Sequence, residues 1–260
     1  MSEEYRVSGA PRAALVTGGV RRIGRAICLA LARAGYAVAV HGRPDATDAG
    51  DLLDELREHG VAAAYVEADL SLPAERDALV ARACAVVGPL TLLVNNASQY
   101  EDDAFGALDA AVWEQQVAVN LTAPIMLAQS FAAQAPAGAD ASIVNITDQR
   151  VRKPVPRHFS YSLTKCALDA ATVMMAQALA PRVRVNAVAP GPTLPSLRQD
   201  PAAFAMQQAV LPLEEGPGPE DIAAAVVYLA SARCITGESI AVDGGQHIAW
   251  KTPDAFGIDE

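Results

Sequence analysis

The sequence predicts an α/β fold, and two observations carry this prediction. Segments of strand character alternate with segments of helical character along the chain, which is typical of sheets whose strands are joined by helices. The chain has 260 residues, of which 52% are hydrophobic, enough to bury one large core. We therefore expect a single domain over residues 10–251, with a loose arm at 1–9 and a C-terminal tail at 252–260.

The composition argues against several classes of function. The formal net charge is −10 and the pI about 4.9, so the average surface repels nucleic acid and anionic membranes. The four cysteines lie far apart with no CxxC pair, which predicts reduced core thiols rather than disulfides or a metal site. With no signal peptide and no apolar run long enough for a membrane span, we expect a cytoplasmic protein.

Buried apolar runs and helical periodicity give the order of the elements. The predicted strands are 13–16, 36–40, 61–67, 90–94, 142–147, 182–189 and 239–242. The predicted helices follow the first strand up to about residue 35, then cover 45–59, 73–87, 108–135, the region of Tyr161 and Lys165, and 219–231. Residues 193–218 are rich in proline and are predicted to form a mobile lid.

The first strand runs into a glycine-containing turn, Thr17-Gly18-Gly19-Val20-Arg21-Arg22-Ile23-Gly24, which opens a helix. Glycines let backbone N–H groups approach a pyrophosphate, and the helix N-terminus adds partial positive charge. A purely structural tight turn is the alternative. The cofactor-binding residues predicted here are Gly18, Arg21, Arg22, Ile23 and Gly24.

The end of the second strand indicates which nucleotide is bound. A turn that selects NAD normally has an acidic residue at this strand end, whereas this chain has His41 and Arg43. Together with Arg21 these side chains predict a site for the 2′-phosphate of NADPH. Asp45 is an acid nearby, and the other interpretation of it is the N-cap of the next helix.

Polar and turn residues follow the later strands as well. In open parallel sheets ligands bind outside the carboxyl ends of the strands, where both Asn95 and Asn96 fall. Further cofactor contacts are predicted at Asp69, Leu70, Asn96, Ala97, Ser98, Pro190 and Gly191.

Tyr161 and Lys165 are four residues apart on a predicted helix, so their side chains share one face. An ammonium beside a phenol favours the phenolate and lowers the tyrosine pKa from about 10, which makes the pair suited to proton transfer. The alternative is two unrelated surface residues. Their helix and the one around Asn120 are apolar or small nearly all round, which predicts a partner subunit over Leu168, Met174 and Met175.

This set of motifs resembles the short-chain dehydrogenase/reductase family over essentially the whole chain. The motifs are Thr17-Gly18 to Gly24, Asn95-Asn96-Ala97, Asn120, Tyr161-x-x-x-Lys165 and Pro190-Gly191. The resemblance implies a Rossmann-type doubly wound, seven-stranded, mostly parallel sheet with helices on both faces, a nicotinamide cofactor and a homotetramer. It also implies that Tyr161 is the acid and contacts the cofactor, that Lys165 binds the nicotinamide ribose and lowers the tyrosine pKa, and that Asn120 holds a proton-relay water.

Two departures narrow the resemblance to the pteridine reductases, including the bacterial dihydromonapterin and dihydrofolate reductases. Arg22 stands where the family usually has the middle glycine of the turn, and Asp148 stands where it usually has the catalytic serine. Similarity to that branch implies that Ser98, Tyr100, Asp148, Tyr161 and Arg22 contact the substrate. A carboxylate only accepts hydrogen bonds and repels a developing alkoxide, so it suits the N–H donors of a pterin better than a simple ketone. In the alternative interpretation, Asp148 caps the following turn and Arg22 only neutralises phosphate.

Three functions remain open at this point. The first is an NADPH-dependent reductase of a dihydropterin, such as dihydromonapterin, dihydrobiopterin or dihydrofolate. The second is a reductase of another carbonyl or imine compound, for example a 3-oxoacyl thioester. The third is a catalytically idle NADPH-binding protein, for which the loss of Tyr161 or Lys165 would have been the usual sign.

Overall fold

The computed structural model describes residues 12–44, 49–195 and 199–250. The predicted arm, Asp45, the tail and part of the predicted lid therefore lie outside the described residues. Among those described, no helix is both long and apolar enough to cross a membrane.

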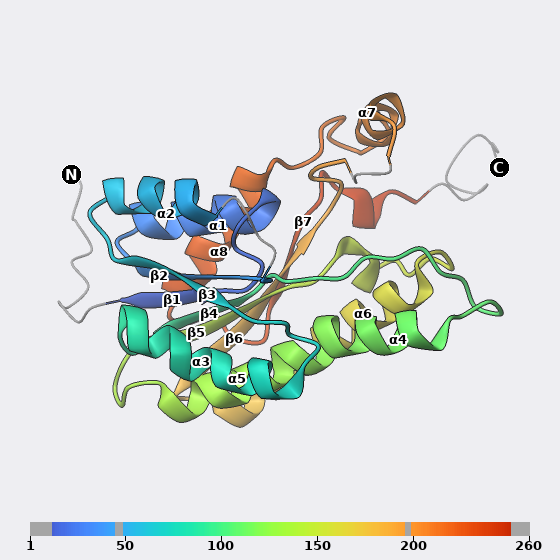
Figure 1. Cartoon of the computed structure of the whole chain (residues 1–260). Helices are drawn as coiled ribbons and strands as arrows, with labels where there is room; N and C mark the ends of the chain where they lie inside the picture. Colours follow the sequence, from blue (N-terminus) through green and yellow to red (C-terminus); the bar gives the residue numbers. More distant parts are fainter. Residues whose placement is uncertain (1–11, 45–48, 196–198, 251–260) are drawn as a thin grey trace, which may run out of the picture.

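Seven strands form one sheet in the order β3-β2-β1-β4-β5-β6-β7, and every pair of neighbours is parallel (Figure 1). The strands are β1 Ala13–Val16, β2 Ala37–Gly42, β3 Ala63–Glu67, β4 Leu92–Asn95, β5 Ala141–Ile146, β6 Val183–Pro190 and β7 Ser239–Val242. The order reverses direction beside β1, which opens a crevice at the carboxyl ends of β1 and β4.

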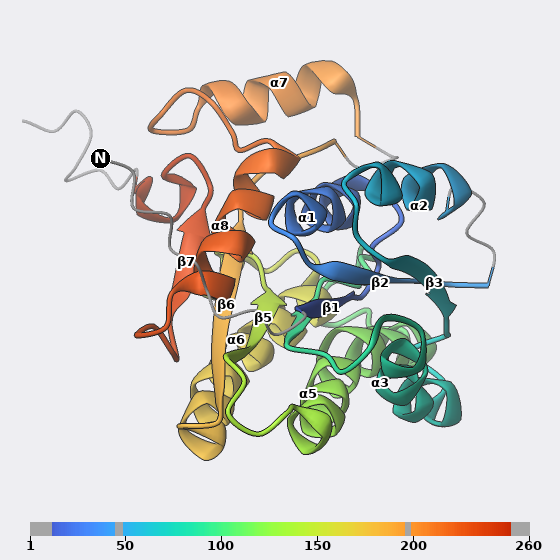
Figure 2. The same cartoon turned by 90° about the vertical axis from the view of Figure 1, so that its left-hand side faces the viewer.

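Helices cover both faces of the sheet. Figures 1 and 2 show α1, α2 and α8 on one face and α3, α5 and α6 on the other. The helices are α1 Arg22–Arg33, α2 Ala49–Glu58, α3 Pro73–Val87, α4 Ala110–Val117, α5 Ala123–Gln134, α6 Phe159–Leu179, α7 Pro201–Ala209 and α8 Pro219–Ser231. The predicted doubly wound, single-domain architecture is confirmed.

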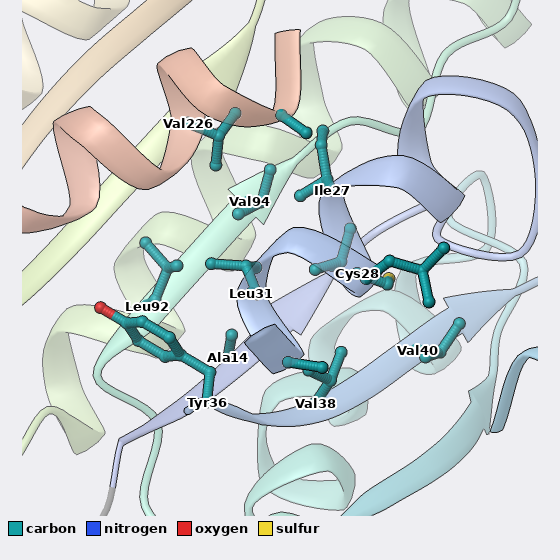
Figure 3. Close-up of a cluster of buried hydrophobic side chains, with 14 of the residues drawn as sticks. Ala14, Ile27, Cys28, Leu31, Tyr36, Val38, Val40, Leu92, Val94 and Val226 are labelled. Atoms are coloured by element: carbon teal, nitrogen blue, oxygen red, sulfur yellow. The ribbon is translucent and has the colours of Figure 1, made fainter. Parts of the chain in front are cut away.

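Two apolar layers hold the helices to the sheet, because successive strand residues point to opposite faces. Val16 and Val94 pack under α1 and α8, in the cluster that Figure 3 shows. Leu15 and Leu93, their sequence neighbours, pack instead with α3 and α5. All four are fully buried, and each such side chain contributes about 1.5–3 kcal/mol relative to exposure.

Several predicted boundaries need correction. The predicted helix over 108–135 begins at Ala110, where the side chain of Asp109 accepts hydrogen bonds from the N–H groups of Ala111 and Val112. It contains a π-helical turn, η1 Ala118–Thr122, between α4 and α5. The predicted lid contains the helix α7, which Asp200 caps through Ala202 and which buries no residue.

Two expectations about side chains also change. The thiol of Cys28 is buried as expected, but Cys234 is exposed. On α6, Leu168 is covered by the chain itself, with 1% exposed, and needs no partner subunit. Met174 is 66% exposed, so the apolar outer surface of α6 includes Met174 but not Leu168.

Candidate active site

The glycine turn after β1 is built for close approach of backbone groups. Gly18 has φ +61°, which favours glycine, and a Cβ on Gly24 would lie 2.0 Å from the carbonyl oxygen of Gly18. The Asn96 amide donates to the carbonyls of Thr17 and Gly18 at 2.9 and 3.0 Å and so fixes the turn. Because α1 begins at Arg22 with no acidic residue in its first turn, its N-terminus suits an anionic pyrophosphate.

His41 is a structural residue, and the prediction that it binds the 2′-phosphate is wrong. Its side chain is 2% exposed, Nδ1 accepts from the Gly18 N–H at 3.1 Å, and Nε2 lies 3.0 Å from the Ala68 oxygen. Burial lowers its pKa to about 4, so the ring is neutral at neutral pH. His41 therefore joins the glycine turn to the segment after β3.

The predicted basic cluster divides into two parts. Arg21 and Arg43 are exposed at the rim of the turn and just beyond the end of β2, where they remain the residues available to a 2′-phosphate. Arg22 has φ +57° and its guanidinium donates to the carbonyls of Leu194 and Pro195 at 3.2 and 3.0 Å. Arg22 therefore spans from the glycine turn to the start of the predicted lid.

Some residues at the strand ends support the site rather than line it. Asn95 is 2% exposed, and its amide donates to Asn145 Oδ1 at 2.9 Å, so its expected position facing the crevice is wrong. The side chain of Leu70 is 5% exposed and packs in the core on the α3 side of the sheet, so only its backbone can contact a cofactor. Asp69 Oδ1 accepts from the hydroxyl of Ser71 at 2.6 Å.

The turn at the end of β6 is closely packed. Pro190 is the last residue of that strand, and a Cβ on Gly191 would lie 2.6 Å from the Cα of Asp243. Just after β4, the backbone N–H of Ala97 donates to the Thr17 hydroxyl at 3.0 Å, which ties the segments that follow β1 and β4 together.

Asn120 lies in the π-helical turn and connects three segments. Its Oδ1 accepts from the Gln99 N–H at 2.7 Å and from Ser98 Oγ at 3.2 Å, and its Nδ2 donates to the Gln99 oxygen and to Thr164 Oγ1 at 2.9 and 3.3 Å. The side chain is fully buried. Protein groups occupy both the oxygen and the nitrogen of this amide. The Asn120 side chain therefore has no free position for the predicted relay water.

The structure brings Tyr161, Asp148 and Lys165 together. The Tyr161 hydroxyl donates to Asp148 Oδ2 at 2.9 Å, whereas Lys165 Nζ donates to the Ile146 carbonyl at 2.8 Å and lies 5.7 Å from the tyrosine ring centroid. Asp148 Oδ1 also caps the following turn, accepting from the Arg150 N–H at 2.8 Å. Asp148 is thus both the predicted site residue and the cap of the alternative interpretation.

The predicted lowering of the Tyr161 pKa is wrong. Burial, and then the charge of Asp148, raise the Tyr161 pKa well above its ordinary value, and burial lowers the pKa of Lys165 to about 8. The physical reasons are that the phenol is buried and that a carboxylate, rather than an ammonium, meets its hydroxyl. Tyr161 is therefore a protonated donor at neutral pH.

Tyr100 forms an aromatic wall next to this group. Its ring meets Tyr161 edge-on, with centroids 4.8 Å apart, and stacks on His158 at 4.4 Å. The backbone holds the wall in place, because Phe159 N donates to the Asp103 oxygen at 3.3 Å. With 40% of Tyr100 exposed, its ring is accessible for stacking on a planar ligand.

Two residues of this site escaped the sequence analysis. Arg150 forms an ion pair with Asp148 at 3.1 Å, and His158 supports Tyr100 from a backbone conformation of φ +51°. The signal for Arg150 was a basic residue two positions after a capping aspartate. His158 carries no periodic or motif signal.

Comparisons with known proteins agree with this geometry. A family model described as enoyl-(acyl carrier protein) reductase matches residues 18–247. The chain is 48% identical to a solved structure of FolM alternative dihydrofolate reductase 1 from Brucella canis complexed with NADP, with a TM-score of 0.89, covering 94% of this chain and 96% of that one. The Brucella suis protein of the same name, also with NADP, is 47% identical with a TM-score of 0.90, covering 94% and 98%.

Other relatives carry different activities in their names. The 3-oxoacyl-[acyl-carrier-protein] reductase FabG of Staphylococcus epidermidis is 31% identical over 244 residues, covering 91% of this chain and 99% of that protein. The predicted family and its pteridine reductase resemblance are confirmed, while the substrate is not decided by these matches.

Proposed function

Since this chain belongs to the short-chain dehydrogenase/reductase family, we propose that it is an NADPH-dependent reductase of a dihydropterin. The substrate is of the dihydromonapterin, dihydrobiopterin or dihydrofolate class, reduced at a ring C=N bond. The single observation that carries the proposal is the carboxylate of Asp148, 2.9 Å from the hydroxyl of Tyr161.

The carboxylate favours a substrate that donates hydrogen bonds. An ionised Asp148 cannot donate to a substrate carbonyl, and it would repel the alkoxide that forms when a ketone is reduced. A pterin instead presents ring N–H and amino groups, which a carboxylate accepts. The exposed face of Tyr100 supplies the flat surface on which a bicyclic heterocycle can stack.

The residues for the cofactor fit this assignment. The glycine turn and the N-terminus of α1 would hold the pyrophosphate, and Arg21 with Arg43 would bind the 2′-phosphate of NADPH. Bound there, NADPH supplies the hydride. The two Brucella structures that resemble this chain contain NADP, which supports the choice of nucleotide.

Tyr161 provides the proton for the substrate nitrogen. Its raised pKa keeps the phenol protonated until the substrate nitrogen becomes basic. The O–H donates to Asp148 in the free chain and turns to the substrate nitrogen when it transfers the proton. Lys165, 5.7 Å from the ring, and Arg150 are the cations near the phenolate that remains after transfer. Asp148 accepts the hydrogen bond again when Tyr161 regains a proton from solvent.

A second candidate is a 3-oxoacyl thioester reductase, favoured by the 31% identity to FabG. A substrate panel separates the candidates: NADPH oxidation is followed by absorbance with three 7,8-dihydropterins and with a 3-oxoacyl thioester. We expect turnover of at least one dihydropterin and little of the thioester. The reverse preference would support the second candidate, and cofactor binding without any oxidation would support a non-catalytic protein.

A further inference from the structure

We propose that Arg150 is a positioning residue that fixes the carboxylate of Asp148 and the ring of Tyr100 in one arrangement. It acts through these two side chains rather than on the reacting atoms. The kinetic part of this inference rests on the proposed function, whereas the structural part does not.

Arg150 holds both oxygens of Asp148. Its backbone N–H donates to Oδ1 at 2.8 Å and its Nη1 donates to Oδ2 at 3.1 Å. The two side chains are only 20% and 15% exposed, so water competes weakly for this pair. Since Oδ2 also accepts from Tyr161, the guanidinium determines how the carboxylate faces the proton donor.

The same guanidinium lies beside both tyrosine rings, which contact each other edge-on. Its central carbon is 5.9 Å from the ring centroid of Tyr100 and 5.9 Å from that of Tyr161, within the range of a cation–π contact. Burial raises the pKa of Tyr100, and the charge of Arg150 and a hydrogen bond from it oppose that shift. Arg150 therefore links the aromatic wall to the acid group.

Only a forked, planar cation makes all of these contacts at once. The guanidinium presents several N–H donors in a fixed plane, so one can bind a carboxylate while another faces a phenol. A lysine in its place would keep the positive charge but lose the planar fork of N–H donors that faces the carboxylate and the phenol together. Charge and geometry can therefore be tested separately.

The test compares Arg150→Gln, which removes the charge, with Arg150→Lys, which keeps it. Arg152→Gln is the matched control, because Arg152 lies in the same loop but donates to the Ser239 carbonyl. For Arg150→Gln we expect kcat/KM with a dihydropterin to fall about ten- to hundredfold, carried by kcat. The NADPH affinity of Arg150→Gln should stay within about twofold of the wild type, since none of the Arg150 contacts involves the glycine turn. Arg150→Lys should recover part of the lost kcat/KM.

A double-mutant cycle with Tyr100→Phe tests the link to the wall. If Arg150 positions Tyr100, the combined loss with Arg150→Gln should be clearly smaller than the product of the two single losses. Independent, multiplying effects would refute the connection between Arg150 and Tyr100.

A titration of phenolate absorbance decides the structural part without any substrate. Arg150 lowers the pKa values of both Tyr100 and Tyr161, against the larger effect of burial. In Arg150→Gln the phenol of Tyr100, the exposed one of the two, should ionise at higher pH than in the wild type, and in Arg150→Lys close to it. Unchanged titration and unchanged kcat/KM in Arg150→Gln would overturn the inference. Equal loss of NADPH binding and melting temperature in both variants would also overturn it and make Arg150 a fold residue.

The two proposals fail in different ways. If the wild type reduces no dihydropterin, the proposed function is wrong, and the titration still decides whether Arg150 positions the two tyrosines. If the wild type reduces a dihydropterin and Arg150→Gln does so equally well, the role of Arg150 alone is wrong.

Discussion

The hydroxyl of Tyr161 donates a hydrogen bond of 2.9 Å to Asp148, and this contact reverses the expected electrostatics of the site. Lys165 reaches a carbonyl of β5 instead of the phenol. The pKa of Tyr161 is therefore raised, first by burial and then by Asp148. The tyrosine is held as a protonated donor, and Asp148, the residue that differs from the family pattern, adds to the effect of burial.

Cofactor preference should depend on Arg43 and not on His41. We predict that Arg43→Glu lowers the rate with NADPH relative to NADH by about tenfold or more, the scale of a charged hydrogen bond of about 1.5–3 kcal/mol. His41→Gln is the control, because His41 is buried behind the turn. Steady-state rates with both cofactors measure the ratio; an unchanged ratio in Arg43→Glu would remove Arg43 as the selector.

His41 should make the fold sensitive to acid. Its pKa is about 4 in the folded chain against 6.5 for the free side chain, so protons bind more readily to the unfolded state. The stability from neutral His41 is complete above pH 6.5 and is lost as the pH falls toward 4. The loss is on the order of 2–3 kcal/mol.

Denaturant unfolding of the wild type and His41→Asn between pH 7 and about 4.5 measures this effect. The amide oxygen of asparagine can accept from the Gly18 N–H but does not titrate. We expect the wild type to lose more unfolding free energy than the variant over this interval. Parallel curves would show that another group carries the acid sensitivity.

The strands of the sheet could be predicted from the sequence because they are short buried apolar runs with helices between them. All seven strands lie within a few residues of their predicted ranges. His41 was misjudged because β2 continues to Gly42, where His41 pairs with Val66 of β3. Strand alternation then turns His41 to the same side as Ala39, toward the core and away from solvent.

Other features have only a weak signal in a single sequence. The helix α7 is mostly apolar or small and buries none of its residues, so no amphipathic pattern predicts it and only Asp200 and Pro201 mark its start. Arg150 lies in a single 3-10 turn and His158 just before α6, where no periodicity assigns a direction to a side chain. Their roles depend on Tyr100, which is brought to them from the segment after β4.

The exposed apolar side chains of α6 should form a contact between subunits. We predict a homotetramer, in which Leu163, Val173 and Met174 are covered; they are 46%, 45% and 66% exposed in the single chain. Met174→Lys should lower the mass measured by light scattering, while Val86→Lys on α3, an exposed apolar residue elsewhere, should not. A wild-type monomer at micromolar concentration would contradict this.

The assignment of the substrate depends on Asp148, and Asp148→Ser should separate two activities. If the carboxylate accepts from the nitrogen donors of a pterin and orients Tyr161, its loss should reduce dihydropterin turnover about ten- to hundredfold. The serine can donate to a carbonyl oxygen, so reduction of a 3-oxo ester should hold or rise. Steady-state assays with both substrates measure the two responses.

NADPH affinity serves as the control for this variant, because Asp148 is not among the residues proposed to bind the cofactor. We expect the dissociation constant, measured by fluorescence, to change less than twofold in Asp148→Ser. Asp148 also caps the turn that begins at Gln149, so a structural loss is the competing explanation. Weaker NADPH binding together with equal losses on both substrates would assign Asp148 to that cap and remove the main support for a pterin substrate.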